Sequence, residues 1–231
     1  MTPEEVAAFL SRGRIVDLSK KVTPGNAPGA VGAPSRRYEL EQFRFPPGEI
    51  MHYIAMESHI STHVEAPSHF MPVISDQRGH DVSEVALDRF FGMGVLIDCR
   101  DAGPREALGP EFLAKFPIMG GDIILVGCSK YKGVDRPFIT PEGIRQMVAD
   151  KKIKMLGYDD TVSVEDPEYR GKVIEKYLTH YHVLANEVPL IEQMAHLEEL
   201  SKPRFMFFGF PAAMGGLDSF PIRAVAVEFP E

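Results

Sequence analysis

Residues 59–69 read His-Ile-Ser-Thr-His-Val-Glu-Ala-Pro-Ser-His, which places three imidazoles and one carboxylate within eleven positions. Imidazole nitrogens and carboxylate oxygens are the ligands that zinc and related divalent cations favour. A chance cluster of surface histidines is the competing interpretation, and it explains one pair more easily than three histidines with a glutamate. The stretch therefore predicts a metal site.

The spacing of His59 and His63 predicts the local backbone. On a flat strand four positions would separate them by about 13 Å, at roughly 3.3 Å per residue, which is too far for one ion. On a helical turn, residues i and i+4 share a face and approach to roughly 6 Å. We therefore expect a coiled backbone near Ser61. The residue before Pro67 avoids the helical region, so the turn should end before it and let Glu65 face the same ion.

The composition indicates a globular protein without a nucleic-acid partner. The chain has 231 residues, 44% of them hydrophobic and 25% charged, with a formal net charge of −8. A nucleic-acid-binding protein would need a basic face. The first residues lack the apolar run of a signal peptide, and no run approaches the roughly 20 apolar residues that span a bilayer. We expect a cytoplasmic protein with no membrane partner.

The chain contains two cysteines, Cys99 and Cys128. Two cysteines indicate neither a disulfide framework nor a thiolate metal site. Both follow apolar runs that resemble strand ends, so we expect buried, unreactive thiols.

Short apolar runs alternate with helical patterns, which favours one α/β domain over residues 1–231. The expected strands cover residues 14–19, 94–99, 122–126, 154–158, 188–191, 205–208 and 222–227. One expected helix covers residues 4–12, a second begins where Thr140 caps the chain before Pro141, and a third covers residues 171–184. Residues 23–36 are rich in Pro, Gly and Ala and should form a loop.

A second candidate cluster contains His180 and Glu192. Glu192 ends an otherwise apolar strand, and a carboxylate in that place needs a partner or water. His180 falls near the end of an expected helix, where a cation is favoured by the helix dipole. The residues alone leave a metal site and these ordinary roles equally open.

The segment from His59 to His69 resembles the His-x-Gly-Thr-His-x-Asp-x-Pro-x-His motif of the metal-dependent hydrolases called the cyclase family. This family contains bacterial kynurenine formamidase and isatin hydrolase. Similarity to the family extends over most of the chain. The matching segments are Asp17-Leu18-Ser19, residues 121–125, Asp160-Thr161-Val162-Ser163, His180 with Glu192, and the closing segment at residues 215–224.

The resemblance implies a fold and a ligand set. The fold is a swivelling β/β/α domain, assembled as a homodimer or homotetramer. His59 and His63 would hold one metal ion, Glu65 would bridge to another, and His180 with Glu192 would complete the second site. The resemblance thus implies two zinc or manganese ions per chain.

The resemblance also implies a reaction. His69 would be the general acid/base of a hydrolase that opens an amide-type C–N bond in a small molecule, an aryl formamide or a cyclic amide. A third nitrogen ligand is the alternative role for His69. A lactone hydrolase using the same site and a metal-stabilised binding protein without turnover are the alternative functions.

Two substitutions depart from the family motif. Glu65 replaces an aspartate, and its extra methylene would alter the spacing between metals or the choice of ion. Ser61 replaces a glycine, which indicates less unusual backbone angles there.

Kynurenine formamidases also carry a Trp-Pro-Gly-Asp-Thr-like loop after the first strand. Here that place holds Pro28-Gly29-Ala30-Val31-Gly32-Ala33-Pro34, and the chain has no tryptophan. N-formylkynurenine therefore need not be the best substrate. The four other histidines that we expect outside the site, as surface, packing or neighbouring residues, are His52, His80, His182 and His196.

Overall fold

The computed structural model describes residues 2–27, 29, 35–169 and 172–229. The strands are β1 (Arg14–Asp17), β2 (Tyr38–Phe45), β3 (Glu49–Met56), β4 (His63–Glu65), β5 (Phe91–Asp98), β6 (Ala107–Leu108), β7 (Ile123–Gly127), β8 (Phe138–Ile139), β9 (Met155–Asp159), β10 (Leu190–Met194), β11 (Arg204–Phe208), β12 (Ser219–Pro221) and β13 (Val225–Glu228). The α-helices are α1 (Pro3–Leu10), α2 (Met71–Ile74), α3 (Pro110–Leu113), α4 (Pro141–Ala149) and α5 (Leu178–Leu184). Short 3₁₀ turns are η1 (Pro67–His69), η2 (Leu87–Arg89), η3 (Gly133–Asp135), η4 (Ile174–Lys176) and η5 (Leu197–Glu199).

Nine of the strands form one sheet in the order β1-β13-β11-β5-β7-β9-β10-β4-β12. The central strands β5, β7, β9 and β10 are parallel, and the strands on both flanks pair antiparallel. Parallel strands that are covered on both faces consist of nearly continuous apolar residues. β7 fits this rule, since all five of its residues are buried. The α/β class is confirmed.

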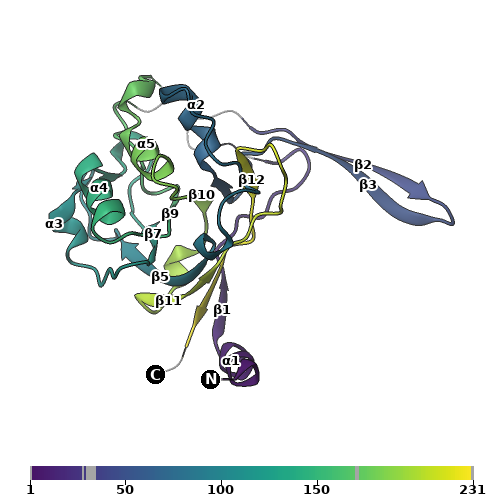
Figure 1. Ribbon diagram of the computed structural model, residues 1–231, viewed down its shortest axis with the longest axis horizontal. Coiled ribbons are helices and arrows are strands. Elements are labelled where there is room, and N and C mark those ends of the chain that lie inside the picture. The colour runs from purple at the N-terminus through teal and green to yellow at the C-terminus, as the bar shows by residue number, and fades with distance from the viewer. Residues whose placement is uncertain (1, 28, 30–34, 170–171, 230–231) are drawn as a thin grey trace.

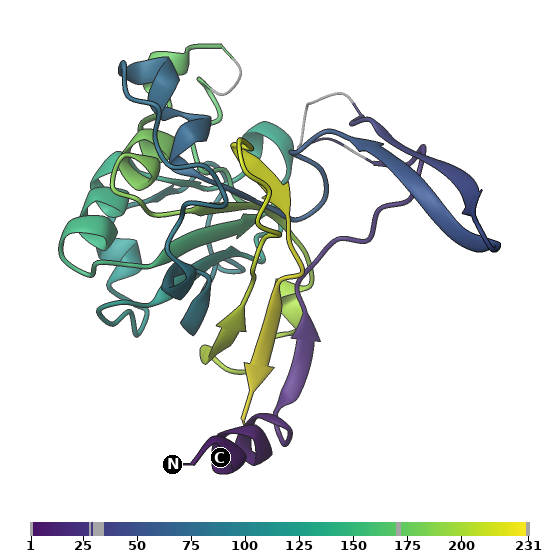
Figure 2. The same cartoon turned by 45° about the vertical axis from the view of Figure 1, so that its right-hand side comes forward.

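The sheet separates two hydrophobic cores. Alternate residues of β7 face opposite sides, so that Ile124 belongs to one core and Leu125 to the other. The first core lies under α3, α4 and α5, which gather beside one face of the sheet (Figure 1). The second core lies on the other face. It includes buried residues of β1, β11 and β13, flanking strands of the same sheet that run together in Figure 2.

Helix α4 begins as the sequence predicts. The Thr140 hydroxyl accepts a hydrogen bond from the Gly143 N–H at 3.1 Å, and Pro141 occupies the first turn, where its missing N–H costs nothing. Ile144 and Met147 are buried against the first core.

Strands β2 and β3 form a hairpin that projects from the body of the molecule (Figure 1). Apolar side chains are exposed on both of its faces, among them Ile50 at 57% and Tyr53 at 63%. The sequence analysis missed this hairpin. Residues 38–41 and 43–45 alternate between apolar and polar, but Gln42 shifts the pattern by one residue, and both faces of the hairpin are exposed. After β3 the chain leads directly to His59.

Other differences from the expected elements are local. The predicted helix at residues 171–184 is wrong in length: α5 begins only at Leu178, because Tyr177 has a non-helical ψ of 60° and separates it from η4. Residues 170–171 lie outside the described residues. So do residues 28 and 30–34, which include most of the position where kynurenine formamidases have their tryptophan loop. The predicted strand at 222–227 begins at Val225, and a separate strand, β12, precedes it. Across the described ranges, every helix is too short or too polar to cross a bilayer.

Candidate metal centre

Strand β4 carries the centre of the site and lies between β10 and β12. Successive side chains of a strand point to opposite faces, so His63 and Glu65 share one face while Val64 packs into the second core. In the antiparallel pair of β10 and β4, Glu192 lies directly opposite His63. Directly opposed residues point to the same side of a sheet, and this pairing brings the second sequence cluster to the first.

A bend before β4 brings His59 back over the same face. Ser61 adopts a left-handed conformation with φ of 58°, and the His59 and His63 ring centroids lie 5.0 Å apart. The predicted helical turn is wrong: residues 57–62 contain no helix. The prediction of ordinary backbone angles at Ser61 is also wrong. The left-handed conformation costs a non-glycine residue roughly 1–2 kcal/mol, and Ser61 offsets it by donating its hydroxyl to the Lys20 carbonyl oxygen.

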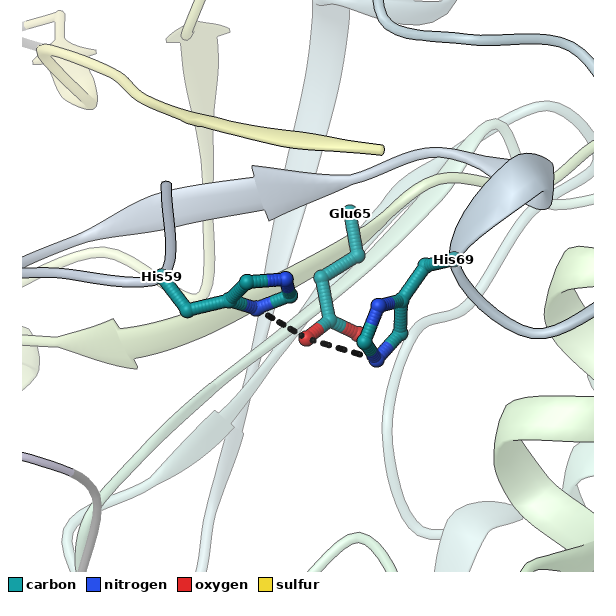
Figure 3. A group of neighbouring side chains, drawn as sticks. All are labelled: His59, Glu65 and His69. Atoms are coloured by element: carbon teal, nitrogen blue, oxygen red, sulfur yellow. Dashed lines mark ion pairs between the residues drawn. The ribbon is translucent and has the colours of Figure 1, made fainter. Parts of the chain in front are cut away.

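Figure 3 shows how His59, Glu65 and His69 meet. Glu65 Oε1 lies 3.1 Å from His59 Nδ1 and 3.5 Å from His69 Nε2. His69 ends η1, which begins at Pro67 and turns the chain back toward β4. The three side chains form a group that could hold a metal ion, with one carboxylate oxygen from Glu65 and one nitrogen from each histidine as ligands.

A second group adjoins the first. His63 Nε2 lies 3.7 Å from Glu65 Oε1 and 3.9 Å from Glu192 Oε2, and these three side chains could also hold an ion. His180 Nε2 lies 3.7 Å from Glu65 Oε2 and 3.6 Å from Glu192 Oε1. All six residues that the sequence singled out therefore converge, with Glu65 common to both groups. His59 groups with His69 and His63 with Glu192, so the assignment of each ligand to one ion stays a prediction.

The neighbouring polar groups are residues that sequence reasoning missed. Glu165 is buried and accepts hydrogen bonds from His180 Nδ1 at 2.8 Å and from the His180 backbone N–H at 2.9 Å. The Tyr158 hydroxyl donates to Glu192 Oε1. Asp218 contacts both His59 and His69. None of the three has a spacing in the sequence that relates it to its partner, because only the sheet brings them together.

The carboxylates hold two of the histidines protonated in the metal-free protein. Burial lowers the pKa of His59, but hydrogen bonds with Asp218 and Glu65 outweigh it and raise the pKa to about 9. Burial likewise opposes protonation of His180, and hydrogen bonds with Glu165 and Glu192 raise its pKa to about 10. Burial works against ionisation of Glu65, yet the surrounding histidines keep its pKa well below the usual value.

The side chains present fit a divalent metal ion. His63 donates from Nδ1 to the Ser61 carbonyl oxygen at 2.9 Å, which leaves a lone pair on Nε2 in the neutral ring. His63 Nε2 and Glu65 Oε2 are buried and have no hydrogen-bond partner. Such atoms cost roughly 1–3 kcal/mol each when they stay unsatisfied. A cation between them would satisfy both, and nitrogen and oxygen donors suit zinc or manganese.

The two thiols take no part in this site. Cys99 is buried and Cys128 is half-buried. Burial raises the pKa of the Cys128 thiol to about 12, so neither a thiolate ligand nor a nucleophile is available there at neutral pH.

The sequence model of the cyclase family matches residues 7–166, more than half of the chain. The chain belongs to the cyclase family. Kynurenine formamidase of Bacillus thuringiensis (strain Al Hakam) is 27% identical to this cyclase-family chain over 176 residues, which cover 74% of the chain and 77% of that protein. The resemblance drawn from the His59–His69 motif is thereby confirmed.

Two solved structures share the fold of this cyclase-family chain. Isatin hydrolase A from Labrenzia aggregata superposes with a TM-score of 0.80 at 24% identity, over 98% of this chain and 99% of that one. Isatin hydrolase A from Ralstonia solanacearum gives a TM-score of 0.77 at 19% identity, over 99% and 98% of the two chains. The predicted fold class of the cyclase family is confirmed.

The remaining histidines lie outside both groups. His52 is exposed on the hairpin, and His80 pairs with Glu187 at the surface. His196 is exposed beside η5, and His182 is half-buried on α5.

Proposed function

We propose that this chain is a metal-dependent hydrolase that opens an amide-type C–N bond in a small molecule, an aryl formamide or a cyclic amide. The observation that carries the proposal is the partnerless Nε2 atom of buried His63, which faces Glu65 and Glu192 in a chain of the cyclase family. The named relatives support the bond type, since kynurenine formamidase and isatin hydrolase are named for a formamide and for a cyclic amide.

We propose His59, His63, Glu65, His180 and Glu192 as the ligands of two ions, zinc or manganese. When bound, a divalent ion lowers the pKa of water toward about 7 and polarises a carbonyl oxygen. The chain's own contribution is to hold the five donor side chains in one place. Four of the five are less than a tenth exposed, which excludes bulk water from the donors.

His69 is the proposed general acid/base. Its side chain is 29% exposed, so it lies where a substrate could reach the site, and its Nε2 faces Glu65. Its other nitrogen is held by Asp218 at 2.7 Å. A histidine anchored in this way can take a proton from the attacking water and give it to the departing nitrogen.

We propose one domain over residues 1–231, because β1 near the start pairs with β13 near the end. We propose a homodimer or homotetramer, because exposed apolar side chains on both faces of the hairpin form a surface that isolated soluble chains avoid. Light scattering on the purified protein measures the assembly directly.

The decisive experiment is a substrate screen at controlled metal content. The protein is stripped with EDTA, reloaded with zinc or manganese, and assayed on N-formylkynurenine, isatin and an aryl lactone. We expect hydrolysis of at least one amide that depends on added metal. Equal rates with and without metal would contradict the proposal. Turnover of the lactone alone would make the chain a lactone hydrolase, and bound metal without any turnover would make it a binding protein.

A further inference from the structure

The Asp218 carboxylate contacts two site histidines at once. Its Oδ2 atom lies 3.0 Å from His59 Nε2 and 2.7 Å from His69 Nδ1. We propose that Asp218 is a positioning residue that sets the tautomers of both rings, an inference that rests on the proposed function. One carboxylate would thus orient a proposed metal ligand and the proposed general acid/base together.

The tautomer of each ring depends on which of its nitrogens faces the Asp218 carboxylate. A neutral imidazole has one N–H and one lone pair, and a carboxylate can only accept. In the neutral rings, which is the state that metal binding requires of His59, an Asp218 that accepts from His59 Nε2 and His69 Nδ1 leaves the lone pairs on His59 Nδ1 and His69 Nε2. These are the two nitrogens that face Glu65 Oε1, at 3.1 and 3.5 Å. His59 therefore presents Nδ1 to Glu65, and His69 presents Nε2. An isolated imidazole could adopt either tautomer, so the choice depends on Asp218.

Asp218 is itself held in place by the backbone around β4. Its carbonyl oxygen accepts the Ala66 N–H at 2.8 Å, and the next residue, Ser219, pairs with Glu65 where β12 joins β4. The residue before it, Leu217, accepts the Val82 N–H at 3.0 Å. The Asp218 backbone is thus attached to the same strand that carries His63 and Glu65.

Its exposure separates Asp218 from the ligand set. The Asp218 side chain is 37% exposed, whereas that of Glu65 is 3% exposed. Asp218 belongs to neither group of side chains that could hold an ion. Carboxylates that bind the far nitrogen of a metal-binding histidine fix its orientation, and their loss typically weakens metal affinity about 10–100-fold.

The matched control is another carboxylate–imidazole pair in the same chain. Glu187 Oε2 lies 2.7 Å from His80 Nδ1, and both side chains are exposed and lie outside both groups that could hold an ion. Glu187→Gln removes the charge of such a pair without touching the metal centre, as Asp218→Asn does within it.

The test measures zinc binding and tautomers without any substrate. The zinc dissociation constant is measured by chelator competition, and long-range ¹H–¹⁵N NMR on zinc-loaded ¹⁵N-histidine protein identifies the protonated nitrogen of each ring. His59 and His69 signals are assigned by their loss in His59→Ala and His69→Ala. We expect Asp218→Asn to bind zinc about 10–100-fold more weakly and to lose the fixed Nδ1–H form of His69. Asp218→Glu should restore part of the affinity, and Glu187→Gln should match the wild type.

The inference stands only if affinity and tautomer both change. Unchanged tautomers in Asp218→Asn would overturn it at any zinc affinity, and so would unchanged affinity. Thermal unfolding of the metal-free variants checks that each one folds, and Asp218→Asn is isosteric with the wild-type side chain. Because the readouts use zinc alone, a wild type that binds zinc but hydrolyses nothing contradicts the proposed function and leaves this inference to be judged separately.

Discussion

Glu192 on β10 faces His63 on β4, and 3.9 Å separates Glu192 Oε2 from His63 Nε2. The two residues come from clusters far apart in the sequence, and strand pairing alone brings them together. Side chains alternate along a strand, so a slip of one residue in this register would turn Glu192 to the opposite core. The integrity of the site therefore depends on the β10–β4 pairing.

The first prediction concerns His63, the buried histidine whose Nε2 has no partner. Metal at a hundred times its dissociation constant stabilises a folded protein by about 2.7 kcal/mol. His63→Ala should lose most of this increment, since each tenfold loss of affinity removes about 1.4 kcal/mol. Calorimetry with and without zinc measures it, together with metal analysis. The exposed His80→Ala serves as control, and an unchanged increment in His63→Ala would remove His63 from the ligand set.

The second prediction concerns pH. Carboxylates raise the pKa of His59 to about 9 and that of His180 to about 10, from an ordinary 6.5. Their protonated forms stabilise the metal-free fold fully below pH 6.5, and this stability is lost as the pH rises through about 9 and 10. Histidine ligands must be neutral, so metal displaces these protons and binds more tightly as the pH rises.

Two measurements check this sign. Titration calorimetry near pH 7 in buffers of different ionisation enthalpy should show proton release on zinc binding. The rise in melting temperature caused by zinc should grow from pH 6.5 toward pH 9. Zinc binding without proton release would mean that His59 and His180 are already neutral in the metal-free protein.

The third prediction concerns Glu165, which accepts two bonds from His180 and lies 3.3 Å from the Thr179 N–H at the start of α5. Hydrogen bonds to a charged group contribute roughly 1.5–3 kcal/mol. Glu165→Gln should lower the free energy of unfolding by about that amount and weaken metal binding at His180. The control is Glu142→Gln, an exposed carboxylate in the first turn of α4. Urea unfolding of the metal-free proteins measures the free energy of unfolding. Equal values for the two variants would show that Glu165 does not stabilise α5.

The sequence predicted the parts of the fold whose cause is local. The central strands are marked by continuous apolar runs, as in β7, and α4 by Thr140 and Pro141 at its start. The β2–β3 hairpin escaped because both of its faces are exposed. The shortened α5 escaped because its interruption lies in one dihedral angle at Tyr177, a residue that most helices accept.

The site shows the same division. Residue types and spacing were enough to single out His59–His69, and the family resemblance joined His180 and Glu192 to them. The way the side chains approach was predicted wrongly, because spacing alone favoured a helical turn over a single left-handed residue at Ser61. The sequence did not identify Asp218 or Glu165 as site residues, because only the folded chain brings them to their histidine partners.

The last prediction separates proton transfer from metal binding at His69. His69 Nδ1 is held by Asp218, and its Nε2 lies 3.5 Å from Glu65 Oε1 in one of the groups that could hold an ion. Geometry alone thus permits a third nitrogen ligand as well as a general acid/base. The two roles differ in what survives when the ring is removed.

If His69 moves protons, His69→Ala should keep its metal and its melting temperature while turnover falls by roughly 10²–10⁴, the usual share of general acid–base catalysis. The wild type should show one limb of its pH–rate profile that the variant lacks. Metal content and turnover must be measured on one preparation, because a ligand would lose both together. The His69 side chain is 29% exposed, so its removal leaves little buried space and the variant should still fold. Metal lost in step with activity would make His69 a ligand, and metal and activity both retained would assign the proton transfer to another group.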